Sequence, residues 1–129
     1  MLSISKHTSL VLHHRSRNMS QRLRQFAPLL RKLHKSSRKT QLNLLKKNFS
    51  KEFIHCLCEC CLNMIKGNVK LNKAQKSRLL RQRKYLRKFM LKKTSLAKKR
   101  KIVQKGGFLG AILSPIISIL GGLFGNRQQ

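Results

Sequence analysis

Acidic residues are nearly absent from this sequence. Glu52 and Glu59 are the only two among 129 residues, against 31 lysines and arginines, so the formal net charge is +29. So one-sided a charge makes the compact chain repel itself, which predicts a polyanionic partner such as nucleic acid or anionic lipid. With so few carboxylates for acid–base chemistry and no glycine-rich phosphate loop, we expect neither an enzyme nor a bound cofactor.

Aromatic residues are also scarce: tryptophan is absent, and there are one tyrosine and six phenylalanines. Proteins that read single-stranded RNA stack its bases on aromatic side chains, so this composition argues against recognition of that kind. Affinity that comes from the release of counterions needs no such platform and no reading of sequence. The composition therefore favours contact with the phosphate backbone of a nucleic acid.

The spacing of the apolar residues predicts an all-α fold whose small basic body, of three to five helices, covers residues 20–105. We expect helices over 20–35 (with a kink or a new start at Pro28), 38–48, 51–66, 73–92 and 96–105. The signals for helix ends are caps at Ser50 and at Thr94 or Ser95, a stop at Gly67, and a capping box at Asn72 and Gln75.

The segment 51–66 is the most apolar part of this body, and we expect it to be the central helix. Its wide apolar face holds Phe53, Ile54, Leu57, Cys60, Cys61, Met64 and Ile65. Its remaining side carries Glu52, His55 and Glu59, with Glu52 in the first turn, where the helix dipole favours an acid.

The N-terminal residues 1–19 form a leader that is disordered or serves in targeting. They contain no acid and carry serine and arginine, as mitochondrial presequences do. The alternative is that translation starts at Met19 and that the residues before it are an upstream extension of the reading frame.

Four cysteines, Cys56, Cys58, Cys60 and Cys61, stand close together in the expected central helix. A single helix cannot direct all four sulfurs at one ion, so we predict no metal site. We expect Cys60 and Cys61 in the core and Cys56 and Cys58 at its boundary, as thiols in a reducing compartment. Zinc binding, a role between subunits and disulfides are the weaker alternatives.

The strongest functional signal of the body is its two basic runs at 81–88 and 92–101. Such runs serve as nuclear import signals or as patches that bind nucleic acid. The residues that we expect to contact phosphates are Arg78, Arg81, Arg83, Lys84, Arg87, Lys88, Lys92, Lys93, Lys98, Lys99, Arg100 and Lys101.

The C-terminal segment 106–125 is an uncharged apolar tail. Its length is just enough for a membrane-type segment, and a membrane tolerates the proline at its middle, Pro115. The residues expected to face lipid are Phe108, Leu109, Ile112, Leu113, Ile116, Ile117, Ile119 and Leu120. Three interpretations stay open: a tail anchor that leaves the basic body cytoplasmic, a segment that inserts conditionally, and a tail that docks on a partner or an oligomer interface.

The junction between the basic body and the uncharged tail resembles that of adenovirus-type minor core proteins, the protein X (mu precursor) group. Similar small proteins are expected in adenovirus-like mobile elements of the Polinton and adintovirus kind. The resemblance lies in the basic stretch followed by Gly106–Gly107–Phe108–Leu109 and an apolar run broken by Pro115. It implies a virion core protein that condenses packaged DNA in the virion and the host nucleus. It also implies a candidate protease site at Gly106 and Gly107, where Gln104 replaces the aliphatic residue or Met of the family.

These observations predict a non-enzymatic protein that binds and condenses double-stranded DNA without sequence preference, and whose tail contacts a membrane or a capsid protein. A small tail-anchored or peripheral membrane protein, with its basic body on anionic lipid, is the alternative. A ribosomal or mitoribosomal accessory protein is the third.

Overall fold

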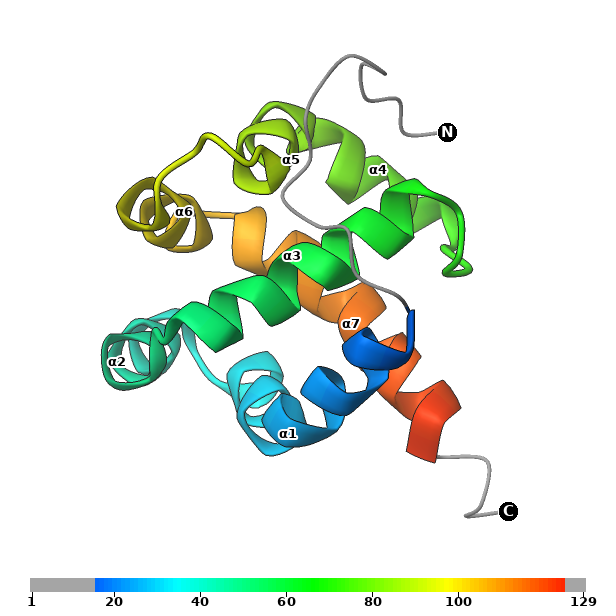
Figure 1. Cartoon of the computed structure of the whole chain (residues 1–129), viewed down its shortest axis with the longest axis horizontal. Helices are drawn as coiled ribbons and strands as arrows, with labels where there is room; N and C mark the ends of the chain where they lie inside the picture. The colour runs from blue at the N-terminus through cyan, green and yellow to red at the C-terminus, as the bar shows by residue number, and fades with distance from the viewer. Residues whose placement is uncertain (1–15, 125–129) are drawn as a thin grey trace.

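The computed structural model describes residues 16–124, and within that range the chain forms seven α-helices and no strand, which confirms the all-α class (Figure 1). The helices are α1 (Ser16–Lys35), α2 (Arg38–Asn48), α3 (Lys51–Ile65), α4 (Lys73–Arg81), α5 (Arg83–Met90), α6 (Leu96–Val103) and α7 (Phe108–Phe124). Of the expected leader, residues 1–15 lie outside this range, and residues 16–19 belong to α1.

Helices α3 and α7 cross at the centre of the molecule, with α1 and α2 to one side and α4, α5 and α6 to the other (Figure 1). Helix α3 contacts α1, α5, α6 and α7, and helix α7 contacts α1, α3, α4 and α6. The core therefore lies around these two helices, which confirms that the segment 51–66 is central.

Helix α3 begins and ends where its sequence signals lie. The hydroxyl of Ser50 accepts a hydrogen bond from the backbone N–H of Phe53 at 3.0 Å, and the chain turns away at Gly67, whose φ is +84°. Because neighbours surround the helix on several sides, all four cysteines are buried. The boundary position expected for Cys56 and Cys58 is therefore wrong.

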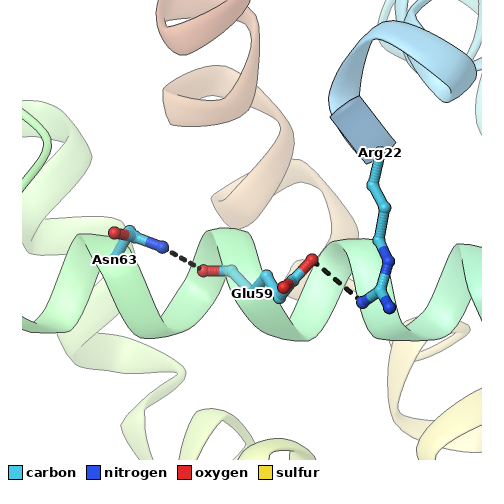
Figure 2. A network of polar contacts seen from close by, with 3 residues as sticks. All are labelled: Arg22, Glu59 and Asn63. Atoms are coloured by element: carbon cyan, nitrogen blue, oxygen red, sulfur yellow. Dashed lines mark hydrogen bonds and ion pairs between the residues drawn. The ribbon is translucent and has the colours of Figure 1, made fainter. Parts of the chain in front are cut away.

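Glu59 is also buried, although its charge placed it on the polar side of the sequence pattern. Its carboxylate Oε1 lies 3.0 Å from Nη1 of Arg22, which comes from α1, and only 3% of the Glu59 side chain is exposed (Figure 2). One turn further along α3, Asn63 donates from Nδ2 to the backbone carbonyl of Glu59 at 2.8 Å (Figure 2). The ion pair is what allows an acid to lie between two packed helices.

The apolar tail forms α7 and fills the interior of the protein. Six of the eight residues that the sequence assigned to lipid are buried, and Ile117 and Ile119 are partly buried. Those six are Phe108, Leu109, Ile112, Leu113, Ile116 and Leu120. The ring of Phe108 meets that of Phe89 edge-to-face, with 5.4 Å between centroids, and Gln75 of α4 donates to the hydroxyl of Ser114 at 3.0 Å.

Among residues 16–124, no single helix is both long and apolar enough to cross a membrane. Within these residues, only α6 and α7 taken together have the length and apolar composition of a membrane span, and the two helices meet at an angle of 86°.

Two helix boundaries differ from those expected. Helix α1 runs through Pro28 without a new start, because Leu23, Ala27, Leu30 and Leu33 keep one continuous face in the core. The helix expected over 73–92 is interrupted at Gln82, so the expectation of one helix is wrong there. The side chain of Gln82 packs against Gly107 so closely that a Cβ atom at Gly107 would lie 2.9 Å from its amide nitrogen.

Helices α2 and α6 bind one another's C-terminal carbonyl groups through arginines. Arg100 of α6 donates from Nε and Nη2 to the carbonyl oxygen of Phe49, at 3.1 and 2.7 Å. In return, Arg38 of α2 donates to the carbonyl oxygen of Gln104. Phe49 and Gln104 are the C-terminal caps of α2 and α6, so each cation meets the negative end of a helix dipole.

Candidate nucleic-acid interface

The exposed faces of α4, α5 and α6 carry most of the cations that the sequence assigned to phosphate binding. Helix α5 shows how the pattern works: Leu86, Phe89 and Met90 are buried, while its arginines and lysines are exposed. Ten of the twelve predicted residues are exposed. They are Arg78, Arg81, Arg83, Lys84, Arg87, Lys88, Lys92, Lys93, Lys98 and Lys101.

A groove of about 530 Å³ runs between α5 and α6, and we call it the lysine groove. Its lining residues are Tyr85, Lys88, Leu91, Lys93, Thr94, Ser95, Lys98, Lys101, Ile102 and Lys105. Five of these ten are lysines, three carry a hydroxyl group, and none is acidic. Because both acids of the chain lie on α3, no carboxylate within the groove neutralises these lysines.

The loop between α5 and α6 creates this groove by reversing the chain. The N–H of Thr94 donates to the carbonyl of Leu91 at 3.2 Å, and the hydroxyl of Ser95 then caps α6 by accepting from the N–H of Lys98 at 3.2 Å. Residues from two consecutive helices thereby line one depression.

Tyr85 and Lys105, which both line the lysine groove, contact each other. The Nζ atom of Lys105 lies 4.9 Å from the centroid of the Tyr85 ring, within the range of a cation–π contact. The basic runs of the sequence did not indicate Lys105, Tyr85, Thr94 or Ser95 as interface residues. Lys105 lies outside the basic run at 92–101, and only the packing of α6 on α5 brings it beside Tyr85.

A second groove, of about 460 Å³, adjoins the lysine groove across α5, and we call it the arginine groove. Its lining residues are Ser77, Leu80, Arg81, Arg83, Lys84 and Tyr85. It lies over the break between α4 and α5, and it shares Tyr85 with the lysine groove. The two grooves together form a cationic face that extends over three helices.

Lys99 and Arg100, the remaining two predicted residues, occupy structural positions. Lys99 is buried, with 4% of its surface exposed, and burial lowers the pKa of its ammonium group. Arg100 is partly buried, and its guanidinium group binds the carbonyl of Phe49. A basic run cannot reveal this division, because every residue in it has the same charge.

The four cysteines are free thiols in the core. Burial raises the pKa of Cys58 from 9.0 to about 12, and its thiol donates to the carbonyl oxygen of Phe89 at 3.4 Å. A hydrogen bond with Cys56, together with burial, raises the pKa of Cys60, and burial raises that of Cys61. Such protonated thiols are poor nucleophiles and poor metal ligands. In the part of the chain that the structure describes, no group of three or more His, Cys, Asp or Glu residues is arranged to hold a metal ion.

The candidate protease site, Gly106 and Gly107, lies in the exposed turn between α6 and α7. Gly107 has a φ of +87°, a conformation that side-chain-bearing residues rarely adopt. The turn thus requires glycine for its own geometry.

No protein-family model matches this chain, and neither a curated protein nor a solved structure matches it. The resemblance to adenovirus-type minor core proteins therefore stays a prediction from the sequence.

Proposed function

We propose that this protein binds double-stranded nucleic acid, DNA in the first place, through the phosphate backbone and without sequence preference. The observation that carries the proposal is the lysine groove, where five lysines and three hydroxyl groups line one depression without an acid. The adjoining arginine groove extends the same charge across α4 and α5. We infer a binding protein and not an enzyme, because neither groove is lined by a carboxylate, histidine or cysteine.

The chemistry of these side chains suits a phosphate backbone. Lysine ammonium groups are flexible point charges that follow phosphates in many geometries, so they favour no particular base sequence. Arg81 and Arg83 add planar guanidinium groups that can bind phosphate through two hydrogen bonds. The hydroxyl groups of Tyr85, Thr94 and Ser95 can donate to phosphate oxygens.

Condensation of the bound duplex follows from cations outside the two grooves. Lys32 and Lys35 at the end of α1 and Lys46 and Lys47 at the end of α2 are exposed. A protein that neutralises phosphates from more than one side can bridge two duplex segments. We therefore propose compaction of DNA as the consequence of binding, and a virion core as its setting, on the strength of the sequence resemblance. Neighbouring genes for a capsid protein, a packaging ATPase and a protease would support that setting.

The test is an equilibrium titration of the full chain with two duplex DNAs of unrelated sequence over a series of salt concentrations. The full chain is needed, because a fragment that ends at Lys105 would lack α7 and with it a large part of the core. If each of the five groove lysines neutralises one phosphate, log affinity falls with log salt at a slope of about −4.5. Equal affinity for both duplexes is expected. Affinity that does not depend on salt, or that is confined to one sequence, would contradict the proposal.

The α6–α7 pair favours a second function, the binding of an anionic membrane. Helix α7 carries no charged residue from Phe108 to Phe124, and the basic body would hold lipid headgroups. For that function α7 has to leave the core, where it lies against α1, α3 and α4. Extraction of membranes with alkaline carbonate separates the two functions, since a protein anchored by α7 stays with the membrane.

A further inference from the structure

Ser95 is an exposed hydroxyl group within the lysine groove. Five lysines line the same depression: Lys88, Lys93, Lys98, Lys101 and Lys105. The residue lies at the end of the non-helical segment 91–95, and Lys92 and Lys93 precede it by three and two positions. An accessible serine that follows cationic residues in a non-helical segment is what an acidic kinase cleft can bind.

We propose that Ser95 is a phosphorylation site, modified by a protein kinase that selects cationic substrates, and that the phosphate releases bound nucleic acid. The inference rests on the proposed function, because it names a regulation of the same groove. In the reaction, Oγ of Ser95 attacks the γ-phosphorus of ATP and forms a new P–O bond. The bond to the bridging oxygen of ADP breaks, ADP leaves, and the hydroxyl proton passes to the base of the kinase.

The groove supplies the partners that a phosphate at this position requires. A phosphoserine carries nearly two negative charges at neutral pH, and a cluster of cations binds it through charge-assisted hydrogen bonds. The lysines that line the groove with Ser95 place five ammonium groups around the same depression. These lysines are the ones proposed to bind DNA. The attached phosphate thus competes for them at a very high effective concentration, and its charge repels the duplex.

Among the residues that the structure describes, the other hydroxyl groups lack this combination. Thr94, the neighbour of Ser95, is only partly exposed, and its N–H closes the turn to Leu91. Ser77 is exposed but lies within α4, where the backbone is helical. Ser50 is an exposed helix cap like Ser95, but it lines neither groove.

That similarity makes Ser50 the matched control. Both serines cap a helix with their hydroxyl group, at 3.0 Å to Phe53 N in one case and 3.2 Å to Lys98 N in the other. Aspartate is as good a cap as serine, so S95D and S50D should both fold while adding the same negative charge at different places. A difference in DNA affinity between S95D and S50D therefore shows that the position of the added charge matters.

The experiment has two parts. The full wild-type chain and S95A are incubated with ATP and a kinase that prefers basic substrates, and the modified residue is located by mass spectrometry. The affinity for duplex DNA is then measured for phosphorylated and unmodified protein, S95D and S50D. We expect Ser95 to be modified, and the phosphate, which cancels about two cations, to weaken binding by about tenfold. S95D should weaken binding by a smaller factor and S50D by less than twofold.

The outcomes separate this inference from the function on which it rests. If the unmodified chain binds no duplex, the proposed function fails and the inference with it. If it binds duplex but S95D and S50D behave alike, the groove is not the site of regulation and the inference alone is overturned. The same conclusion follows if the kinase leaves Ser95 unmodified in the folded chain.

Discussion

Arg22 and Glu59 form an ion pair that joins α1 to α3, with 3.0 Å between Nη1 and Oε1 (Figure 2). The chain has 31 cationic side chains and two acids, yet one of those acids is buried in the core. The charge of Arg22 is therefore neutralised within the protein, and this arginine stabilises the packing of α1 on α3.

The substitution E59Q should lower the free energy of unfolding by about 2–4 kcal/mol, because it leaves the arginine in a partly buried position without its counter-charge. Urea denaturation followed by circular dichroism measures the change. The matched control is E52Q, which removes the other, exposed acid and should cost about 0.3–1 kcal/mol, the usual size of a helix-dipole interaction. Equal effects of E59Q and E52Q would show that the buried pair contributes nothing special.

Helix α7 should contribute to stability as a core element. I116A removes a fully buried side chain and should cost about 2–5 kcal/mol. The control is I117A, the same substitution at the next, partly exposed position, which should cost clearly less. Thermal or urea unfolding of the two variants decides the point, and similar losses would contradict the packing of α7 seen here.

The neighbours Arg100 and Lys101 should separate stability from binding. R100Q removes both hydrogen bonds to the carbonyl of Phe49 and should lower the free energy of unfolding by about 1–3 kcal/mol, with little effect on DNA affinity. K101Q alters an exposed residue of the lysine groove and should weaken DNA binding with little change in stability. The account of the basic run is wrong if both variants lose affinity to the same degree.

Stability should fall at alkaline pH because of the buried thiols. The unfolded Cys58 ionises near its ordinary pKa of 9.0, whereas burial keeps it protonated in the folded protein up to about 12. Above pH 9 the unfolded chain therefore binds fewer protons, and this thiol lowers the free energy of unfolding by about 1.4 kcal/mol per pH unit. Lys99 acts in the opposite sense as its usual pKa of 10.5 is approached, since burial lowers its pKa in the folded state.

The measurement is denaturation under reducing conditions between about pH 8 and 10. C58S is the control, because a hydroxyl group can still donate to the carbonyl of Phe89 but does not titrate in this range. The variant should show the shallower decline, and identical pH profiles would exclude the buried thiol as the cause.

The sequence contained the local information for most of this fold. The caps at Ser50 and Ser95, the capping box of Asn72 with Gln75 and the turn at Gly67 are all present, because each depends on residues a few positions apart. The spacing of Leu79, Leu86, Phe89 and Met90 likewise indicates one apolar face, and all four side chains are buried.

The remaining features depend on contacts between distant parts of the chain. The break at Gln82 coincides with the contact to Gly107, and the burial of Glu59 depends on Arg22. An apolar stretch of 17 residues has the same composition in a membrane as in a protein core, and only the packing of α1 and α4 on α7 distinguishes them.

For the interface, the sequence indicated the charge but not the shape. Ten of the twelve cations are exposed, since a hydrophilic run seldom enters a core. Lys105 and Ser95 join the site only because the loop between α5 and α6 turns the chain back on itself.

The most direct test of the account compares the salt dependence of duplex binding for two triple variants of equal net charge. K88Q/K98Q/K101Q removes three exposed lysines from the lysine groove, and K39Q/K51Q/K66Q removes three exposed lysines that line neither groove and are not proposed to bridge duplexes. If the groove binds phosphates, the first variant loses about 2.7 from the log–log salt slope, at about 0.9 per contact, and the second keeps most of it. Equal losses in the two variants would mean that total charge, and not the lysine groove, determines binding.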